Sequence, residues 1–145
     1  MSRLHASAVS RQGKAVLLIG AAGAGKSTLA LELMSLGADL LADDAVDLRR
    51  EGSQITLSCP SSIKGKIEAR KVGLLSVPSV DHARLAFIVN LDKTSAGRLA
   101  PPEAQMILGV KIPLIRGKGV SGLTAIIWCL LGDGQLWPGS DVSEK

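Results

Sequence analysis

The feature that most limits the fold of this chain is a glycine-rich octapeptide between two apolar segments of different periodicity. Residues 20–27 read Gly-Ala-Ala-Gly-Ala-Gly-Lys-Ser and match the pattern G-x-x-x-x-G-K-[ST] at every fixed position. Residues 15–19 before it are a short run of branched apolar residues, which predicts a buried strand. Over residues 27–36 the apolar positions recur at helical spacing, and Gly37 is typical of a helix end. This order of strand, tight loop and helix predicts an α/β fold.

The octapeptide, called the P-loop below, has the chemistry of a phosphate site. Glycines let the backbone curl so that successive N–H groups point at one anion, and the helix adds its positive end. The Lys26 ammonium can reach the β- and γ-phosphates of a nucleotide, and the Ser27 hydroxyl can ligate Mg²⁺. The alternative is a glycine turn with an incidental lysine. The predicted nucleotide-binding residues are Gly20, Ala21, Ala22, Gly23, Ala24, Gly25, Lys26, Ser27 and Thr28.

Two adjacent acids follow the next predicted strand, residues 38–42. Asp43 and Asp44 come 16 and 17 positions after Ser27. A phosphoryl-transfer site needs a carboxylate near the metal and one near the nucleophile. We therefore predict that one acid holds Mg²⁺ through water and that the other accepts the proton of the nucleophile. The alternative is a solvated turn with a capping aspartate.

The remaining predicted elements carry no functional motif that the residues alone identify. The sequence predicts a hairpin, a polar basic loop, a third core strand, a short helix after two prolines, and an edge strand carrying Pro113. A last apolar segment is left open between helix and strand. The hairpin covers residues 46–58, the basic loop residues 60–73 and the core strand residues 84–91. The helix covers residues 103–108, the edge strand residues 110–116 and the last apolar segment residues 123–131.

Composition excludes several classes of protein. The 145 residues are 46% hydrophobic and 21% charged, which suits one core, so we expect a single domain over residues 1–134 and a polar tail over residues 135–145. A net charge of +4 and an aromatic content of 2% argue against a nucleic-acid partner. No uncharged stretch reaches the ~18 residues of a membrane helix. The mean hydropathy of +0.29 suggests a subunit interface and hence a homo-oligomer.

Location is predicted from the cysteines and from the N-terminal segment. Cys59 and Cys129 lie 70 positions apart and form no metal or disulfide pattern, which favours a reducing, cytoplasmic compartment. The first twenty residues do imitate a secretion signal, with basic residues before an apolar run. We reject that interpretation because the small residues after the run belong to the P-loop.

Four features together resemble the HPr kinase/phosphorylase family. The P-loop is followed by residues 42–46, Ala-Asp-Asp-Ala-Val, which match the family's Ala-Asp-Asp-x-Val segment at the family's distance. His5 lies 22 positions before Ser27, as the family's histidine does. Residues 68–73 match the Glu-x-Arg-Gly-x-Gly signature, with a lysine in place of the first glycine. The resemblance implies a P-loop domain of the phosphoenolpyruvate-carboxykinase-like type, with a mixed sheet.

The resemblance also implies an activity and residue roles. Members use ATP and Mg²⁺ to phosphorylate a serine of the phosphocarrier protein HPr, and many reverse the reaction with inorganic phosphate. By this resemblance, Asp44 accepts the proton of the substrate serine with His5 as its helper. Ser27 and Glu68 are expected to ligate the metal together with Asp43. Arg98, followed by a leucine, matches a catalytic arginine of the family, and Lys26 binds the phosphates.

Two departures qualify the resemblance. Full-length members have a further N-terminal domain, so this chain resembles a short form that consists of the catalytic domain. The family's Gly-Arg-Asn stretch, linked to the reverse reaction, corresponds here to residues 114–120, where only Arg116 and Lys118 carry charge. We therefore expect a kinase with weak or absent phosphorylase activity. The alternatives are a small-molecule P-loop kinase and a non-catalytic ATP-binding regulatory module.

Overall fold

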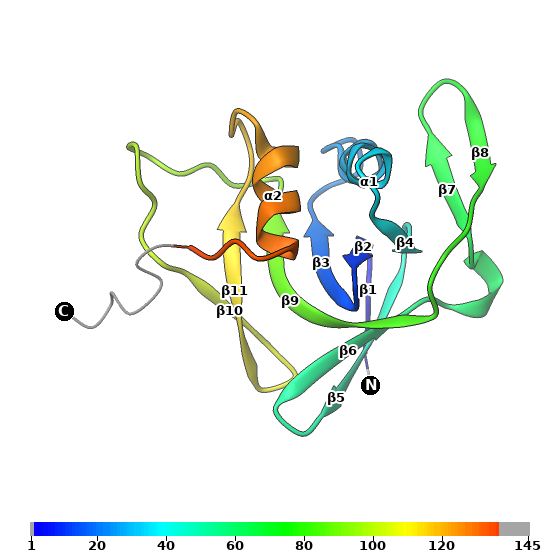
Figure 1. Cartoon of the computed structure of the whole chain (residues 1–145), viewed down its shortest axis with the longest axis horizontal. Coiled ribbons are helices and arrows are strands. Elements are labelled where there is room, and N and C mark those ends of the chain that lie inside the picture. Colours follow the sequence, from blue (N-terminus) through cyan, green and yellow to red (C-terminus); the bar gives the residue numbers. More distant parts are fainter. Residues whose placement is uncertain (1, 137–145) are drawn as a thin grey trace.

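The computed structural model describes residues 2–136, which form one large mixed sheet, a separate hairpin and two helices (Figure 1). In chain order the elements are β1 (Ser2–Leu4), β2 (Ser7–Arg11), β3 (Lys14–Ile19), α1 (Lys26–Ser35), β4 (Asp39–Ala42), β5 (Val46–Glu51), β6 (Gln54–Ser58), a 3-10 turn (Ser61–Ile63), β7 (Lys66–Ala69), β8 (Gly73–Ser76), β9 (His82–Asn90), β10 (Ala104–Ile107), β11 (Val110–Arg116) and α2 (Leu123–Leu131).

The strand that leads into the P-loop lies in the middle of the large sheet. The strand order is β1-β5-β6-β9-β3-β2-β4, with β11 added to β9 and β10 added to β11. Strand β3 pairs with β9 in parallel and with β2 antiparallel, and β2 pairs antiparallel with β4. Strands β3, β4 and β9 therefore run in one direction, and their carboxyl ends meet at one edge of the sheet. In an α/β sheet this edge is where ligands bind.

Hydrophobic side chains cover both faces of the sheet, because successive residues of β3 point to opposite sides. Val16 and Leu18 are fully buried on the face that α1 and α2 cover, where they join Leu33 and Ile127. Leu17 is fully buried on the other face, in a cluster that includes the inward side chains of the β5–β6 and β10–β11 hairpins. The P-loop therefore starts from a strand that is held on both faces.

Helix α1 starts directly at the P-loop, as predicted. Gly25 precedes its first residue at φ 103°, a left-handed conformation that glycine adopts without strain. Leu29, Ala30 and Leu33 are buried against the sheet. The helix ends at Ser35, and Gly37 follows at φ 119°, which confirms the predicted end.

Residues 123–131, for which the sequence did not decide between helix and strand, form helix α2, and two cations from the β2–β3 hairpin bind at its last turn. Arg11 lies 3.9 Å from the centre of the Trp128 ring system and donates a hydrogen bond to the Trp128 carbonyl at 2.9 Å. Lys14 donates to the carbonyls of Leu130 and Gly132 at 3.3 and 3.1 Å. Lys14 binds carbonyls at the helix end, where intrahelical partners run out, and Arg11 adds to the bond that the Trp128 carbonyl accepts from the Gly132 N–H. Both cations match the negative pole of the helix.

Two predicted elements are wrong. The polar loop predicted over residues 60–73 contains strand β7, which pairs with β8 in a hairpin and buries Ile67 completely, in the cluster that contains α1. The helix predicted over residues 103–108 is strand β10, which pairs with β11 across a turn whose central residues, Leu108 and Gly109, have φ of 48° and 82°. A two-residue turn of this kind needs positive φ at both positions, and leucine gives no signal for it.

The expectation that β11 is an edge strand is also wrong. Its first half pairs with β10, and residues Leu114 to Arg116 pair in parallel with β9. Pro113 is tolerated because it lies just before the segment that joins β9. The predicted strands over residues 15–19, 38–42 and 84–91 and the hairpin over 46–58 are confirmed within a few residues.

The expected polar tail lies mostly outside the described residues, from residue 137 onward. Within residues 2–136, no helix is long and apolar enough to cross a bilayer.

Candidate functional site

A cavity of about 520 Å³ lies at the sheet edge where β3 and β4 end. Its walls come from the P-loop and the start of α1, from the residues that follow β1 and β4, and from the β7–β8 hairpin. Ile63 of the 3-10 turn adds one further lining residue. The mixed sheet therefore brings the P-loop, the Asp-Asp pair and the Glu-x-Arg segment into one site.

The P-loop has the backbone conformation that its glycines predict. Gly23 and Gly25 have φ of 86° and 103°, in the left-handed region where a side chain is strained. The Lys26 ammonium donates to the carbonyls of Gly20 and Ala21 at 2.7 and 3.0 Å, and the residue is only 8% exposed. Lys26 is thus held at the loop itself, beside the cavity that it lines.

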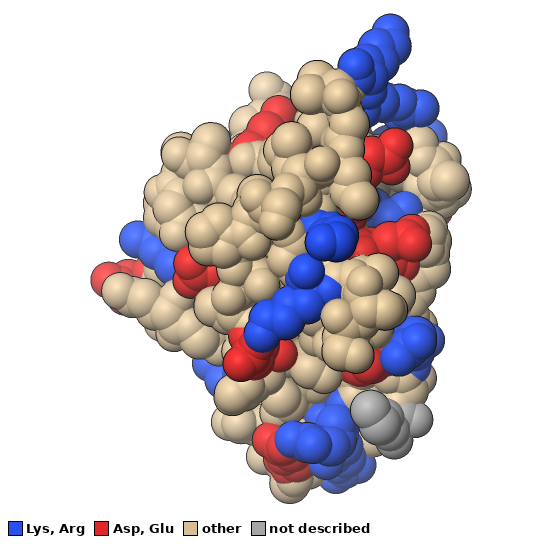
Figure 2. Space-filling model, turned by 90° about the vertical axis from the view of Figure 1, so that its right-hand side faces the viewer, with Lys and Arg blue, Asp and Glu red and all other residues tan. Residues whose placement is uncertain are grey.

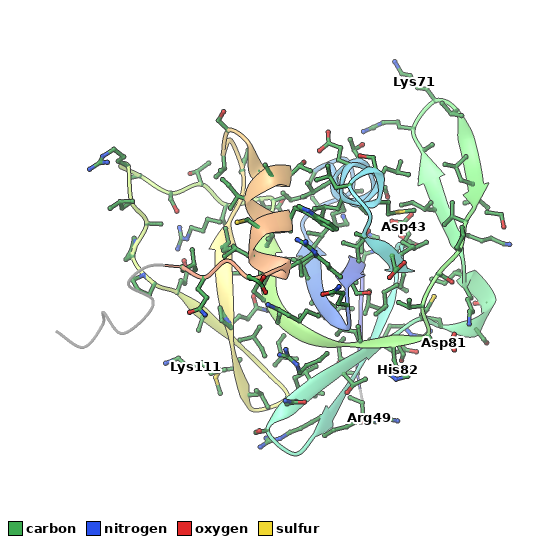
Figure 3. All side chains as sticks on the ribbon, viewed as in Figure 1. Asp43, Arg49, Lys71, Asp81, His82 and Lys111 are labelled. Carbon is green, nitrogen blue, oxygen red and sulfur yellow. The ribbon has the colours of Figure 1, made fainter. Side chains whose placement is uncertain are left out.

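Asp43 is the structural centre of the site. One carboxylate oxygen, Oδ1, accepts hydrogen bonds from the hydroxyls of Ser27 and Ser7, both at 2.7 Å. The other, Oδ2, accepts from the backbone N–H of Glu68 at 3.1 Å. Three donors from α1, β2 and β7 therefore fix one carboxylate that is only 7% exposed. Figure 3 shows Asp43 between α1 and β4.

The residues around Asp43 fit a bound magnesium ion. Among the described residues no cation lies within 4 Å of the Asp43 carboxylate, so its buried charge has only neutral partners. A buried charge without a counter-ion is costly, and a cation in the cavity compensates it. Ser27 and Glu68 line the same cavity and add the oxygen atoms that Mg²⁺ prefers. The three predicted metal ligands are therefore brought together.

Asp44 differs from Asp43 in its exposure, its backbone conformation and its hydrogen-bond partners. Its side chain is 75% exposed at the cavity, and its backbone has φ of 82°, which is rare for a residue other than glycine. The Nδ1 atom of His5 lies 3.0 Å from the Asp44 carbonyl oxygen and 3.2 Å from Oδ1. Pairing of β1 with β5, in which Leu4 lies opposite Val46, brings these two residues together. The predicted proton acceptor and its predicted helper are thus in contact.

The β7–β8 hairpin forms the outer wall of the cavity. Lys66, Glu68, Arg70 and Leu74 all line it. Lys71 projects at the tip of the hairpin (Figure 3) and is absent from the described lining of the cavity. Its φ of 69° explains why the matching signature has glycine at this position, since a left-handed residue with a side chain is strained. On the face shown in Figure 2, basic and acidic side chains are interspersed and form no continuous basic stripe.

Among the predicted nucleotide-binding residues, Gly20, Ala21 and Ala24 are absent from the described lining of the cavity, although they belong to the loop that forms its wall. Among the predicted catalytic residues, Arg98 is the one that the structure does not bring to the described lining. It lies in the exposed segment between β9 and β10.

The structure adds two residues that sequence reasoning missed, Ser7 beside Asp43 and Asp92 beside the P-loop. No pattern marked Ser7. Asp92 directly follows a predicted core strand, which is a weak signal for a residue at the functional edge.

Comparisons with known proteins show the family of this chain. Residues 1–118 match the model of the HPr Serine kinase C-terminal domain family. An HPr kinase/phosphorylase of Exiguobacterium is 36% identical over 107 residues, which is 68% of this chain and 34% of the relative. One from Aromatoleum aromaticum is 32% identical over 139 residues, which is 83% of this chain and 44% of the relative.

A solved structure is also similar. The Hpr(Ser) kinase/phosphatase from Coxiella burnetii matches with a TM-score of 0.79 and 28% identity, covering 90% of this chain and 94% of that one. This match confirms the predicted α/β P-loop fold with a mixed sheet. The chain spans between a third and a half of the length of the curated relatives described above. With the family match over residues 1–118, the P-loop cavity and the Asp-Asp pair in place, the chain belongs to the HPr kinase C-terminal domain family.

Proposed function

We propose that this chain is an ATP-dependent serine protein kinase whose acceptor is an HPr-type phosphocarrier protein. The observation that carries the proposal is the pairing of an exposed Asp44 with His5 at the rim of a cavity that also contains the P-loop. A small acceptor hydroxyl can reach Asp44 from solvent, whereas Asp43 is buried behind it. Family membership supports the same activity.

In the proposed mechanism the chain works by positioning and by charge. ATP supplies the phosphoryl group, and Mg²⁺ neutralises charge on the phosphates. The P-loop N–H groups and Lys26 bind the phosphates, while Asp43 fixes the Ser27 hydroxyl. Asp44 accepts the proton of the substrate serine, and the His5 ring holds the Asp44 carboxylate in place.

The acceptor protein is proposed to dock on the β7–β8 hairpin. Lys66 and Arg70 line the cavity, and Lys71 extends the same positive charge to the tip. Lys64, two positions before β7, forms an ion pair with Asp81, and this pairing holds the pKa of Asp81 below its usual range. Steering of an acidic surface therefore rests on Lys66, Arg70 and Lys71.

The reverse reaction is proposed to be weak or absent. Arg116, one of the two charges that remain where relatives have Gly-Arg-Asn, donates to the Glu103 carboxylate at 2.7 and 3.3 Å and to the Thr94 carbonyl at 3.3 Å. An arginine with these partners is not free to bind inorganic phosphate. Lys118 is exposed but offers a point charge in place of a planar fork.

Location and assembly complete the proposal. We propose a cytoplasmic protein, because both cysteines are free thiols in the structure, as expected in a reducing compartment. We also propose a homo-oligomer. Exposed apolar side chains on α2 and on β10, Ile126 at 40% and Met106 at 62%, support a subunit contact.

The test of the proposed function is phosphoryl transfer to a purified carrier. The protein is incubated with ATP, Mg²⁺ and candidate HPr-type proteins, and intact mass detects the added phosphoryl group. The serine-phosphorylated carrier is then incubated with the protein and inorganic phosphate in the absence of nucleotide, and the pyrophosphate released measures the reverse rate. We expect transfer in the forward direction and little release. No transfer to any carrier, with ATP binding intact, would favour the regulatory-module alternative.

A further inference from the structure

The carboxyl end of β9 lies directly beside the start of the P-loop. Asn90 pairs with Ile19 at the last position of the parallel β3–β9 ladder, and the Leu91 N–H donates to the Ile19 carbonyl at 2.8 Å. The Asp92 N–H then donates to the side-chain oxygen of Asn90 at 2.9 Å. This turn fixes the backbone of Asp92 and directs its side chain to the first peptides of the P-loop.

The Asp92 carboxylate binds the P-loop backbone. The N–H of Ala21 donates to Oδ2 at 2.9 Å and to Oδ1 at 3.1 Å. A Cβ at position 20 would lie 3.1 Å from the Ala24 Cβ, 3.3 Å from the Leu91 Cβ and 3.4 Å from the Asp92 Oδ1, so the loop packs tightly against the turn that carries Asp92. Within the described residues, neither Asp92 nor Ala21 lines the cavity, so the contact is made from behind the loop.

The Gly20–Ala21 peptide, which Asp92 binds through its N–H, is also bound through its carbonyl by Lys26. Its ammonium donates to the carbonyls of Gly20 and Ala21, while Asp92 accepts from the Ala21 N–H. Lys26 has to leave these carbonyls in order to bind phosphate, as the proposed function requires. The Asp92 contact is then the side-chain bond that still holds the Gly20–Ala21 segment.

We propose that Asp92 is a positioning residue that keeps the P-loop in its binding shape while Lys26 moves to the phosphates. The proposal rests on the proposed function, because it assigns the loop to nucleotide binding. It concerns the loop backbone only, and Asp92 makes no contact with substrate.

The negative charge of Asp92 and its contact with the loop predict opposite changes in nucleotide affinity when the side chain is removed. A carboxylate behind the loop repels phosphate, so removal of its charge alone strengthens nucleotide binding. Loss of the bond to Ala21 lets the loop relax, so removal of the positioning contact weakens binding. The sign of the change in affinity therefore separates the two effects.

The experiment uses the full chain with Asp92→Ala and Asp92→Asn. Calorimetry measures the Kd for ATP with Mg²⁺ and for pyrophosphate with Mg²⁺, and kinetics give separate KM values for ATP and for the carrier. We expect Asp92→Ala to weaken binding of both ligands about tenfold, which is ~1.4 kcal/mol. Asp92→Asn retains an oxygen acceptor for Ala21 and should fall between wild type and Asp92→Ala. The KM for the carrier and the melting temperature of the ligand-free protein should stay unchanged, because Lys26 holds the loop in that state.

The matched control is Asp39→Ala, which removes the same charge from an exposed position at the start of β4, the end opposite Asp43. It should leave both Kd values unchanged. Unchanged or tighter binding in Asp92→Ala overturns the proposal, and so does an equal weakening in Asp39→Ala. A parallel fall in melting temperature and rise in both KM values also overturns it, because that result indicates a general structural loss. Wild-type binding without phosphoryl transfer would contradict the proposed function, while the Kd ratios would still decide the role of Asp92.

Discussion

At the scale of single residues, the site separates two neighbouring carboxylates into different environments. Asp43 is buried and accepts three hydrogen bonds, whereas Asp44 is exposed and contacts only His5 among its described side-chain partners. The positive φ of Asp44 turns the chain between them. One acid therefore suits a fixed structural and metal-binding role, and the other suits proton transfer to or from a bound acceptor.

Asp44→Asn should lower the turnover number by ~10²–10⁴, because an amide cannot accept the proton of the serine hydroxyl. The Kd for ATP with Mg²⁺ should change little, since Asp44 is proposed to act on the acceptor side. Steady-state kinetics and calorimetry measure both values. Asp43→Asn is the paired variant, and it should weaken nucleotide binding by disturbing Ser27. If Asp44→Asn is active and Asp43→Asn is dead, the two roles are reversed.

Lys26→Ala should lower the turnover number by ~10²–10³ or more, because this ammonium neutralises charge that develops on the transferred phosphoryl group. Phosphoryl transfer to the carrier, followed by intact mass, measures the loss. Lys118→Ala is the control, since it removes a lysine that is exposed and absent from the described cavity lining. A turnover within tenfold of wild type in Lys26→Ala would contradict the P-loop assignment.

At the scale of elements, the β7–β8 hairpin and helix α2 are each held in place by side-chain contacts with distant segments of the chain. The hairpin is anchored at its base by the buried Ile67 and carries exposed charge at its tip. Helix α2 has two largely buried side chains, Ile127 and Leu131, and relies on Arg11 and Lys14 at its C-terminus. Each element can therefore be tested through one surface residue.

Lys71→Glu should raise the KM for the acceptor several-fold at low salt, because the proposed docking surface is steered by charge. The effect should fade as salt approaches physiological strength, where the Debye length is ~8 Å. Lys111→Glu is the matched control, because Lys111 is exposed on β11, away from the hairpin (Figure 3). Equal KM values for the two variants at low salt would indicate that Lys71 is a solvated surface charge with no role in docking.

Arg11→Ala should destabilise the protein by about 1–2 kcal/mol, through loss of the stacking on Trp128 and of a charged hydrogen bond to a helix-end carbonyl. Denaturant unfolding measures the free energy, and hydrogen exchange should show the loss concentrated in α2. Arg11→Lys keeps the charge without the planar stacking and should lose less. Uniform loss of exchange protection across the sheet would contradict this local role.

At the scale of the whole molecule, the segment between β9 and β10 leads from the P-loop outward to β10, the strand that pairs with β11 (Figure 1). It begins at Asp92, bound to Ala21, and returns to the sheet at β10 and β11. Arg116 binds near both ends of this segment, at the Thr94 carbonyl and at Glu103. The guanidinium thus joins the ends of the segment that carries Arg98, and it holds the pKa of Glu103 below its ordinary value.

The stabilising effect of the Glu103–Arg116 pair should depend on pH. The pKa of Glu103 is lower in the folded protein than in the unfolded chain, so its contribution is present above the unfolded value of ~4.3. The contribution is lost as the pH falls through the lower folded pKa. The difference in stability between wild type and Arg116→Gln should therefore be constant from neutral pH down to about pH 5 and shrink below it. Unfolding of both proteins across this range measures it, and a difference that grows in acid would contradict the pairing.

The sequence by itself determined the parts of this protein that depend on neighbouring residues. The P-loop, its strand and helix and the Asp-Asp turn are local, because glycine conformation, apolar periodicity and strand ends are encoded within a few positions. The combination of motifs was sufficient to indicate the family. Residues 60–73 and 103–108 were misassigned because their strands are stabilised by pairing with partner strands and by buried contacts.

Tertiary structure alone decided how the site is assembled. His5 meets Asp44 through the β1–β5 pairing, Ser7 meets Asp43 across β2 and β4, and Asp92 meets Ala21 through the parallel β3–β9 ladder. These partners are separated by 36 to 71 positions in the chain. Strand order and register fix such contacts, and both depend on long-range packing of the whole sheet, which no local pattern of residues encodes.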